Sequence, residues 1–327
     1  MELGPFGGYL DETKHIPDGF LGPGVAASTW VVAGGSIALA LRAERRDAAP
    51  MPAGILGSVA AFLFAAQMVN VPVAPGTSGH LVGGMLAAVL LGPWRAMLAM
   101  AAVLGVQALL FQDGGITAFG ANFIDMGLAG CVVGYTVAHL ASRRIRGPRG
   151  VAAGAVLGAF AATVCGAALV AAWLSLSGLY PLRGILPVML VTHVAIGLLE
   201  AALTGAILVT LLKWRPDLAL GIGAGPAERR PIALGIGVLG VALLVAAFVA
   251  PFASSLPDGL DKTAQALGFA ERARALWRAP MPEYGLPWTR LALVAPAVAG
   301  IIGTLAVALL AWAISRSLAI RDDASHR

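Results

Sequence analysis

The glycine-rich stretch Gly76-Thr77-Ser78-Gly79-His80 delivers an imidazole to the edge of an apolar segment. A histidine between hydrocarbon and water is poorly solvated, so its ring must form a hydrogen bond, titrate or bind a ligand. Two interpretations follow from this stretch taken alone. His80 could cap a helix or bond a loop carbonyl, or it could be a metal ligand.

Several other side chains could act together with His80. They are imidazoles, carboxylates and amides at or near the ends of apolar segments: His15, His193, Asp113, Glu200, Gln112 and Asn122. Such a set suits divalent nickel, copper, zinc or cobalt, because imidazole nitrogen is a ligand that these ions accept. The alternative is a polar cap in which these groups only bond one another. His139, beside basic residues, and His326, in the tail, are expected to be structural or solvated.

The chain that must position these groups is strongly apolar. It is 58% hydrophobic and 12% charged over 327 residues, whereas a soluble domain carries about 25% charged residues. Apolar runs of about 20 residues recur between polar breaks, as membrane-spanning helices require. The composition therefore predicts an all-α integral membrane protein. Its net charge of +5 comes from basic residues in short loops, which indicates membrane topology and no nucleic-acid partner.

Nine apolar helices are expected, approximately over residues 25–41, 53–71, 79–92, 94–111, 122–142, 150–177, 186–212, 231–252 and 291–315. The third is short for a bilayer, so it could be a buried, tilted or partly re-entrant helix. Most of the 22 lysines and arginines fall on one side of this arrangement. By the positive-inside rule that side is cytoplasmic, which places the N-terminus outside and the C-terminus in the cytoplasm. Cys131 and Cys165 lie in apolar runs and are expected to be buried small residues, in neither a disulfide nor a zinc site.

Several spaced motifs over roughly residues 15 to 215 resemble the cobalt and nickel substrate-capture subunits of energy-coupling factor transporters. The matching stretches are His15-Ile16-Pro17-Asp18-Gly19-Phe20-Leu21, Gln67-Met68-Val69-Asn70, Gly76-Thr77-Ser78-Gly79-His80, Gln107-Ala108-Leu109-Leu110-Phe111-Gln112-Asp113-Gly114-Gly115 and Gly120-Ala121-Asn122. The remaining chain looks like the small two-span accessory component of the same transporters, with an outer segment that begins Pro257-Asp258-Gly259-Leu260-Asp261.

This resemblance implies a bundle of about seven helices for substrate capture, followed by a two-helix hairpin. The expected divisions are an extracytoplasmic N-terminal segment, a substrate-capture domain, a cytoplasmic linker and a two-span accessory domain, over residues 1–24, 25–212, 213–230 and 231–327.

The resemblance also implies a ligand set. In the family, the metal is held by an N-terminal amine, by the backbone nitrogen and imidazole of the next histidine, matched by His15, and by an imidazole matched by His80. Ser78, Gln107 and Asn122 are candidates for orienting these ligands. His193 and Glu200 could form a transit or support site, or simply a hydrogen bond that packs helices.

One departure concerns the N-terminus. Fourteen residues precede His15, and Lys14 adjoins it, where family members have the initiator methionine. Cleavage after Thr13 would make Lys14 the first residue and recreate an amine directly followed by histidine. We hold this cleavage as a hypothesis.

The mechanism that the resemblance implies is ATP-driven import of Ni²⁺ or Co²⁺ as transported substrate across a bacterial or archaeal cell membrane. The sequence has no GxxxxGK[ST] phosphate loop, so two ATPase subunits and a membrane coupling subunit are the expected partners. No enzymatic activity and no cofactor for catalysis are expected. Two alternatives are a self-sufficient secondary transporter or channel for divalent cations, and an intramembrane enzyme. The first lacks visible repeated halves, and the second lacks an HExxH motif.

Overall fold

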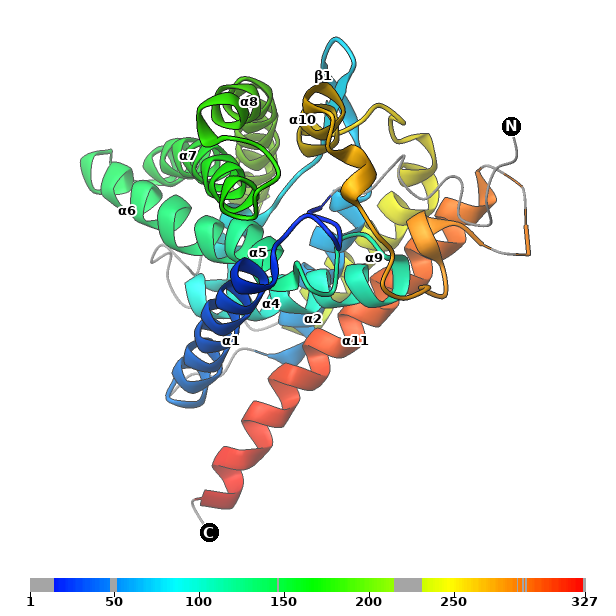
Figure 1. The fold of residues 1–327 in the computed structure, drawn as a ribbon. Helices are drawn as coiled ribbons and strands as arrows, with labels where there is room; N and C mark the ends of the chain where they lie inside the picture. Colours follow the sequence, from blue (N-terminus) through cyan, green and yellow to red (C-terminus); the bar gives the residue numbers. More distant parts are fainter. Residues whose placement is uncertain are drawn as a thin grey trace.

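The computed structural model describes residues 15–47, 52–145, 147–214, 231–286, 288–289, 291 and 293–325. Residues 1–14 of the predicted N-terminal segment and most of the predicted linker, as well as His326, lie outside the described residues. Figure 1 shows an assembly of helices with one small hairpin.

The described residues of the first part of the chain form eight α-helices and a two-stranded antiparallel hairpin. Their bounds are α1 (Pro23–Arg45), α2 (Ala53–Gln67), β1 (Val71–Ala74), β2 (Thr77–Gly79), α3 (Gly84–Leu91), α4 (Pro93–Val106), α5 (Phe119–Asn122), α6 (Tyr135–Arg144), α7 (Pro148–Leu176) and α8 (Leu182–Trp214). Wider π-helical turns extend α4 and join α5 to α6: η1 (Gln107–Phe111), η2 (Phe123–Leu128) and η3 (Gly130–Gly134).

Within the described residues, the second part contains two long helices joined by a segment that the sequence predicts to be extracytoplasmic. The helices are α9 (Pro231–Phe248) and α11 (Val294–Ser325), and the segment between them holds η6 (Ala250–Phe252), α10 (Gly259–Leu267), η7 (Ala270–Arg272) and η8 (Pro282–Tyr284). We call residues 253–286 the outer segment.

Seven of the described helices are long and apolar enough to cross a membrane, which confirms the all-α membrane fold. They cover Pro23–Arg45, Pro93–Phe111, Phe119–Arg144, Arg149–Leu176, Leu182–Lys213, Ala233–Phe252 and Val294–Leu318. The shorter helix α2 is also apolar. A capture bundle followed by two further helices is therefore present as predicted.

Of the alternatives for residues 79–92, which were a short span or a buried, tilted or re-entrant helix, the structure shows a buried helix that is shorter than predicted. Residues 71–79 form the β1–β2 hairpin, and only Gly84–Leu91 is helical. Eight residues rise about 12 Å, which is well short of a hydrocarbon core of about 30 Å. The turn at Pro75-Gly76 joins the two strands. Gly76 has φ +67° there, a conformation that glycine adopts without steric cost. The helix α3 is buried inside the protein instead.

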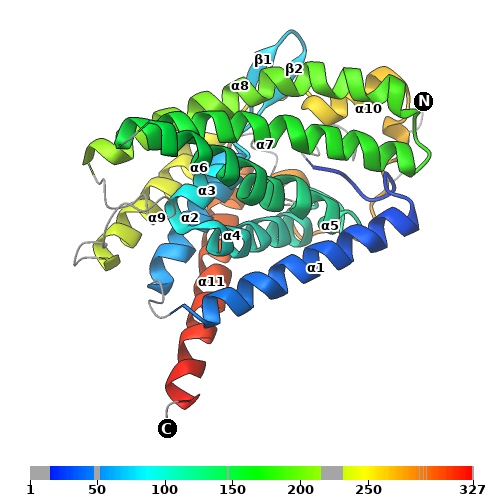
Figure 2. The ribbon, with the colours of Figure 1, turned by 90° about the vertical axis from the view of Figure 1, so that its left-hand side faces the viewer.

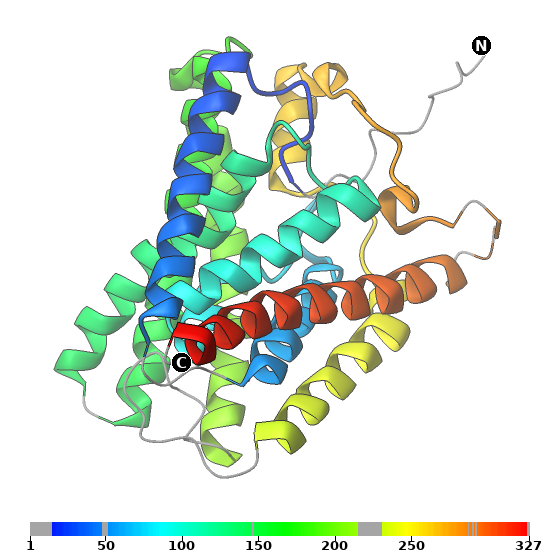
Figure 3. The ribbon, with the colours of Figure 1, turned by 90° about the horizontal axis from the view of Figure 1, so that it is seen from below.

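The helices form layers around α2 and α4. Figure 2 shows α6, α7 and α8 on one side and α1 on the opposite side of these central helices. Figure 3 shows α11 crossing the bundle obliquely, and α11 packs against α2, α4 and α9. Small residues permit this contact: a Cβ at Gly303 would lie 2.2 Å from the Phe64 ring. The second part is thus packed directly onto the first.

The outer segment lies over the loops that carry the candidate ligands. Four backbone hydrogen bonds attach it to the first part: Ser254 N to Asn70 O at 2.9 Å, Ser78 N to Pro257 O at 2.9 Å, Arg274 N to Asp18 O at 2.8 Å and Met281 N to Leu110 O at 3.0 Å. The side chain of Asp258 accepts from Asp261 N at 2.7 Å and so caps α10. The motif Pro257-Asp258-Gly259 therefore has a local structural role, because its aspartate starts this helix.

Candidate metal centre

His15 is buried, with 4% of its surface exposed, and its two ring nitrogens have different surroundings. Nδ1 lies 3.0 Å from Asp113 Oδ1 and 3.2 Å from Asp113 O. Both are acceptors, so Nδ1 carries a proton and, in the neutral ring, the lone pair is on Nε2. Nε2 is buried and has no hydrogen-bond partner among the described residues. This nitrogen is available to bind a cation.

The backbone beside His15 is held by Asn122, on α5. Its Oδ1 accepts from Ile16 N at 3.0 Å, and its Nδ2 donates to Ile16 O at 3.1 Å. Gly115 N also donates to Ile16 O, at 2.9 Å. Asn122 therefore fixes the backbone that carries His15.

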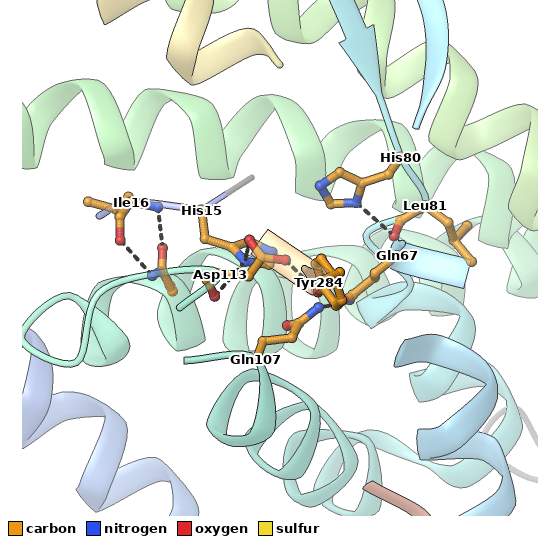
Figure 4. Close-up of polar contacts among 9 residues, drawn as sticks. His15, Ile16, Gln67, His80, Leu81, Gln107, Asp113 and Tyr284 are labelled. Carbon is orange, nitrogen blue, oxygen red and sulfur yellow. Dashed lines mark hydrogen bonds and ion pairs between the residues drawn. The ribbon is translucent and has the colours of Figure 1, made fainter. Parts of the chain in front are cut away.

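His80 follows β2 and is also buried, with 7% exposed. Its Nδ1 lies 3.1 Å from Leu81 O, and because a carbonyl only accepts, Nδ1 is the donor and the lone pair of the neutral ring is again on Nε2. The ring centroids of His15 and His80 are 5.8 Å apart with an interplanar angle of 82°. Figure 4 shows the two rings approaching from separate segments.

The loop after His80 is anchored by Glu200 of α8. Glu200 Oε2 accepts from Val82 N at 2.6 Å, and Oε1 accepts from Gly83 N at 2.9 Å. These bonds satisfy backbone donors just before α3, where Gly83 has φ +79°. His193, on the same helix, has Nδ1 2.8 Å from Met189 O. Glu200 therefore supports the His80 loop.

A chain of buried amides connects the two histidine segments (Figure 4). Gln67 Nε2 donates to Val82 O at 2.7 Å, and Gln107 Nε2 donates to Gln67 Oε1 at 2.8 Å. Asp113 N donates to Gln107 O at 3.1 Å. Gln107 thus links the loop of His80 to the partner of His15.

Ser78 attaches β2 to the outer segment. Its Oγ donates to Leu256 O at 2.5 Å. The structure therefore brings His15 and His80 together. The side chain of Asn122 bonds the backbone of Ile16, that of Gln107 bonds the Gln67 side chain, and that of Ser78 bonds the Leu256 backbone. His139 stacks on Tyr135, with ring centroids 6.0 Å apart, and does not line the site.

A cavity of about 70 Å³ lies beside both imidazoles. His193, Glu200, Asp125 and Asp258 also line it, together with Met85, Met126 and Met189. Asp125 and Asp258 were not predicted. Asp125 could have been found as an acidic residue within an apolar run, which marks function in membrane proteins. Asp258 could not, because its turn motif explains it locally.

Burial and the acidic groups shift the pKa values of three groups in and beside the site. Burial lowers the pKa of His15, but the charge and hydrogen bonds of Asp113 raise it by more, so that it lies above the ordinary value of 6.5. Burial raises the pKa of Asp258 to about 6. Burial and the nearby Asp113 carboxylate both raise the pKa of Tyr284, whose Oη lies 2.7 Å from Asp113 Oδ2. The acidic groups favour a cation here.

Within the described residues, no group of three or more His, Cys, Asp or Glu side chains is arranged to hold a metal ion. The nitrogen donors that converge are the two imidazoles. The amine that the family resemblance implies would come from residues before His15, outside the described part of the chain.

Two family models match this sequence. A model described as the cobalt uptake substrate-specific transmembrane region matches residues 15–218, and a model of the PDGLE domain matches residues 233–319. The predicted resemblance, a capture subunit fused to an accessory component, is confirmed by these two matches.

Two relatives that match along nearly the whole chain are named as fused proteins, and a third is named as a cobalt transport protein. A putative fused nickel transport protein NikMN of Archaeoglobus fulgidus is 35% identical, over 92% of this chain and 98% of the relative. A fused nickel transport protein NikMN of Rhodobacter capsulatus is 32% identical, over 94% and 98%. A cobalt transport protein CbiM of Geobacter sulfurreducens is 33% identical, over 80% and 79%.

Two solved structures of transition metal transporters are similar to this chain. The crystal structure of a transition metal transporter has a TM-score of 0.53 and 32% identity, over 63% of this chain and 96% of that chain. A truncated transition metal transporter has a TM-score of 0.51 and 32% identity, over 61% and 99%.

Proposed function

The chain belongs to the family of cobalt uptake substrate-specific transmembrane regions, and from that premise we propose that it captures Ni²⁺ or Co²⁺ between His15 and His80 for import. It is a multi-pass membrane protein of metal transport and is not an enzyme, as its relatives indicate. Beyond metal transport itself, we propose which residues bind the ion, that the site lies at the outer face of the membrane, and what supplies the energy for uptake.

One observation carries the ligand assignment: Nε2 of His15 is buried, lacks a hydrogen-bond partner among the described residues and lies beside a second imidazole. A buried polar atom without a partner costs about 1–3 kcal/mol. Histidines that bind metals usually donate their other ring N–H to a carboxylate or a backbone carbonyl. His15 donates to Asp113 and His80 to Leu81 O, so both rings have this arrangement.

The ring nitrogens offered to the metal are therefore both Nε2. A chelate that also used the backbone nitrogen of His15 would require Nδ1, because only Nδ1 is near enough to its own backbone. Here Nδ1 faces Asp113. We assign ligation to Nε2 in this chain, and imidazole nitrogen is acceptable to nickel and to cobalt alike.

The energy for uptake is proposed to come from two ATPase subunits and a membrane coupling subunit. The family resemblance supports these partners, as does a sequence without a phosphate-binding loop. The distribution of lysine and arginine supports a metal site at the outer face and partners at the cytoplasmic face. Uptake by cells that produce this chain without those partners would instead favour a self-sufficient carrier.

Nickel titration of the purified protein tests the ligand assignment. Losing a group that only orients a ligand typically lowers metal affinity about 10- to 100-fold. His15→Ala and His80→Ala should each lower the nickel affinity by more than this, because each removes a ligand. His139→Ala is the matched control, since His139 does not line the cavity, and it should bind like the wild type. Unchanged affinity in His80→Ala would overturn the assignment.

A further inference from the structure

Asp113 connects the candidate ligand His15 to the outer segment. One carboxylate oxygen, Oδ1, is 3.0 Å from His15 Nδ1. The other, Oδ2, accepts a hydrogen bond from the hydroxyl of Tyr284 at 2.7 Å. Tyr284 lies in the part of the chain that matches the PDGLE domain model. Figure 4 shows Tyr284 and His15 on either side of this carboxylate.

The direction of the Tyr284 hydroxyl is set by packing. Tyr284 is 7% exposed, and its ring stacks on Phe111, with centroids 4.6 Å apart and an interplanar angle of 18°. Phe64 contacts the same ring, at 6.2 Å between centroids. Rings held on more than one side have little freedom to turn. The hydroxyl is therefore aimed at Asp113.

Backbone conformation marks the same contact. The described residues contain three non-glycine residues with positive φ, namely Gln112 (56°), Glu283 (53°) and Tyr284 (60°). Gln112 directly precedes Asp113, so all three lie at this junction. The left-handed region is unfavourable for side chains with a Cβ and is often retained at functional sites.

Two more hydrogen bonds join the same segments. Met281 N donates to Leu110 O at 3.0 Å, and Ala279 N donates to Gln112 Oε1 at 3.4 Å. The outer segment is thus bonded to the backbone and side chains on the N-terminal side of Asp113 as well as to its carboxylate.

From these observations we propose that Tyr284 is a positioning residue for metal capture. Its hydroxyl holds the Asp113 carboxylate, the carboxylate holds Nδ1 of His15, and Nε2 of His15 is thereby kept facing the cavity beside His80. The second part of the chain thus completes a site whose ligands lie in the first part. This inference rests on the proposed function, because it takes His15 as a ligand.

Tyr284→Phe is the decisive variant, because it keeps the ring stacked on Phe111 and removes only the hydroxyl. Loss of a group that orients a ligand typically weakens metal binding about 10- to 100-fold, and we expect a fall in nickel affinity within that range. Tyr180→Phe, a tyrosine between α7 and α8 that does not line the cavity, is the matched control and should bind like the wild type. Thermal unfolding of both metal-free variants reports whether they are folded.

Two readouts separate positioning from a purely structural role. In ¹⁵N NMR of histidine-labelled protein, with five histidines in the chain, the Nδ1 signal of His15 should shift in Tyr284→Phe. In an Asp113→Asn background, Tyr284→Phe should have little further effect on affinity, because the bridge is already broken.

The outcomes distinguish this inference from the function on which it rests. Reduced affinity in a folded Tyr284→Phe protein, with no further loss in Asp113→Asn, supports it. Wild-type affinity in Tyr284→Phe, or equal losses in both backgrounds, overturns the role of Tyr284 alone, provided that His15→Ala abolishes binding. If His15→Ala binds nickel like the wild type, the proposed function fails and this inference fails with it.

Discussion

The tautomers of two imidazoles determine what this site can bind. His15 and His80 each donate a ring proton from Nδ1 to an oxygen, so each neutral ring has its lone pair on Nε2. A neutral imidazole binds a metal, whereas an imidazolium does not. The protonation of His15 should therefore control binding.

Nickel affinity should fall as the pH is lowered through the pKa of His15. That pKa is raised, since Asp113 more than offsets the effect of burial, so binding should weaken at a higher pH than for an ordinary histidine. Nickel titrations between about pH 5 and 8, the range in which histidines change charge, measure this. In the metal-free protein, the same pair stabilises the fold below the ordinary pKa, and that stabilisation is lost as the pH rises through the raised pKa.

Asp113→Asn is the control for this pH dependence. Without the anionic partner, the pKa of His15 should fall, and the acid loss of affinity should move to lower pH, even if the affinity at high pH is also reduced. If the nickel affinity of the wild type and of Asp113→Asn fell at the same pH, the account would be contradicted.

The chemistry of the ligands could be predicted from residue types, but their partners could not. His15 and His80 were recognisable because two spaced motifs carried them. Asp113 is 98 positions from His15, and Tyr284 is 171 positions from Asp113. Sequence patterns predict which residues share a face of one helix or strand. They do not predict contacts between segments this distant, which only the folded structure shows.

At the scale of elements, α8 supports the His80 loop through one side chain. Glu200 accepts hydrogen bonds from two successive backbone N–H groups just before α3. The carboxylate also lies at the N-terminal end of that helix, where negative charge is favoured. A shift of α8 would therefore be transmitted to His80.

Glu200→Ala should destabilise the protein and weaken nickel binding. The change leaves the N–H groups of Val82 and Gly83 without their acceptor, at a cost of about 1–3 kcal/mol for each buried donor. Thermal unfolding and nickel titration measure the two effects. Thr210→Ala removes another polar group of α8, which bonds only Ala206 O within its own helix, and should be nearly neutral. Equal behaviour of the two variants would rule out this role for Glu200.

The hairpin and α3 show where a pattern of apolar residues is ambiguous. Residues 79–92 are apolar enough to suggest a span, yet α3 is short and packed inside the bundle. An apolar composition indicates only that a segment is shielded from water, and such a segment can lie either in lipid or in the protein interior. The long spans were predictable because an apolar helix of about 20 residues matches the thickness of the bilayer.

At the scale of the whole molecule, the second part of the chain is joined to the first through α2. Both α9 and α11 pack on α2, and the rings of Phe64, Phe111 and Tyr284 meet between the two parts. Displacing α11 should therefore disturb the metal site as well as the helix contact.

Gly303→Leu tests this connection. A Cβ at Gly303 would lie 2.2 Å from Phe64 and 2.8 Å from Phe111, so a leucine must push α11 away, at a cost of about 1–3 kcal/mol for overpacking. We expect a lower melting temperature and weaker nickel binding. In Gly237→Leu, a matched change on α9, the added Cβ has nothing within 4 Å, and both properties should be retained. Normal nickel binding in a folded Gly303→Leu protein would contradict the connection.

The central claim is that His15 and His80 hold the transported ion through their Nε2 atoms. An anomalous difference map of nickel-loaded crystals, collected at the nickel absorption edge, tests it most directly. The account predicts one strong peak within bonding distance of both Nε2 atoms, with Asp113 still at Nδ1 of His15. A peak at Nδ1 of His15, or one deeper in the cavity beside Asp125 and Glu200, would contradict it.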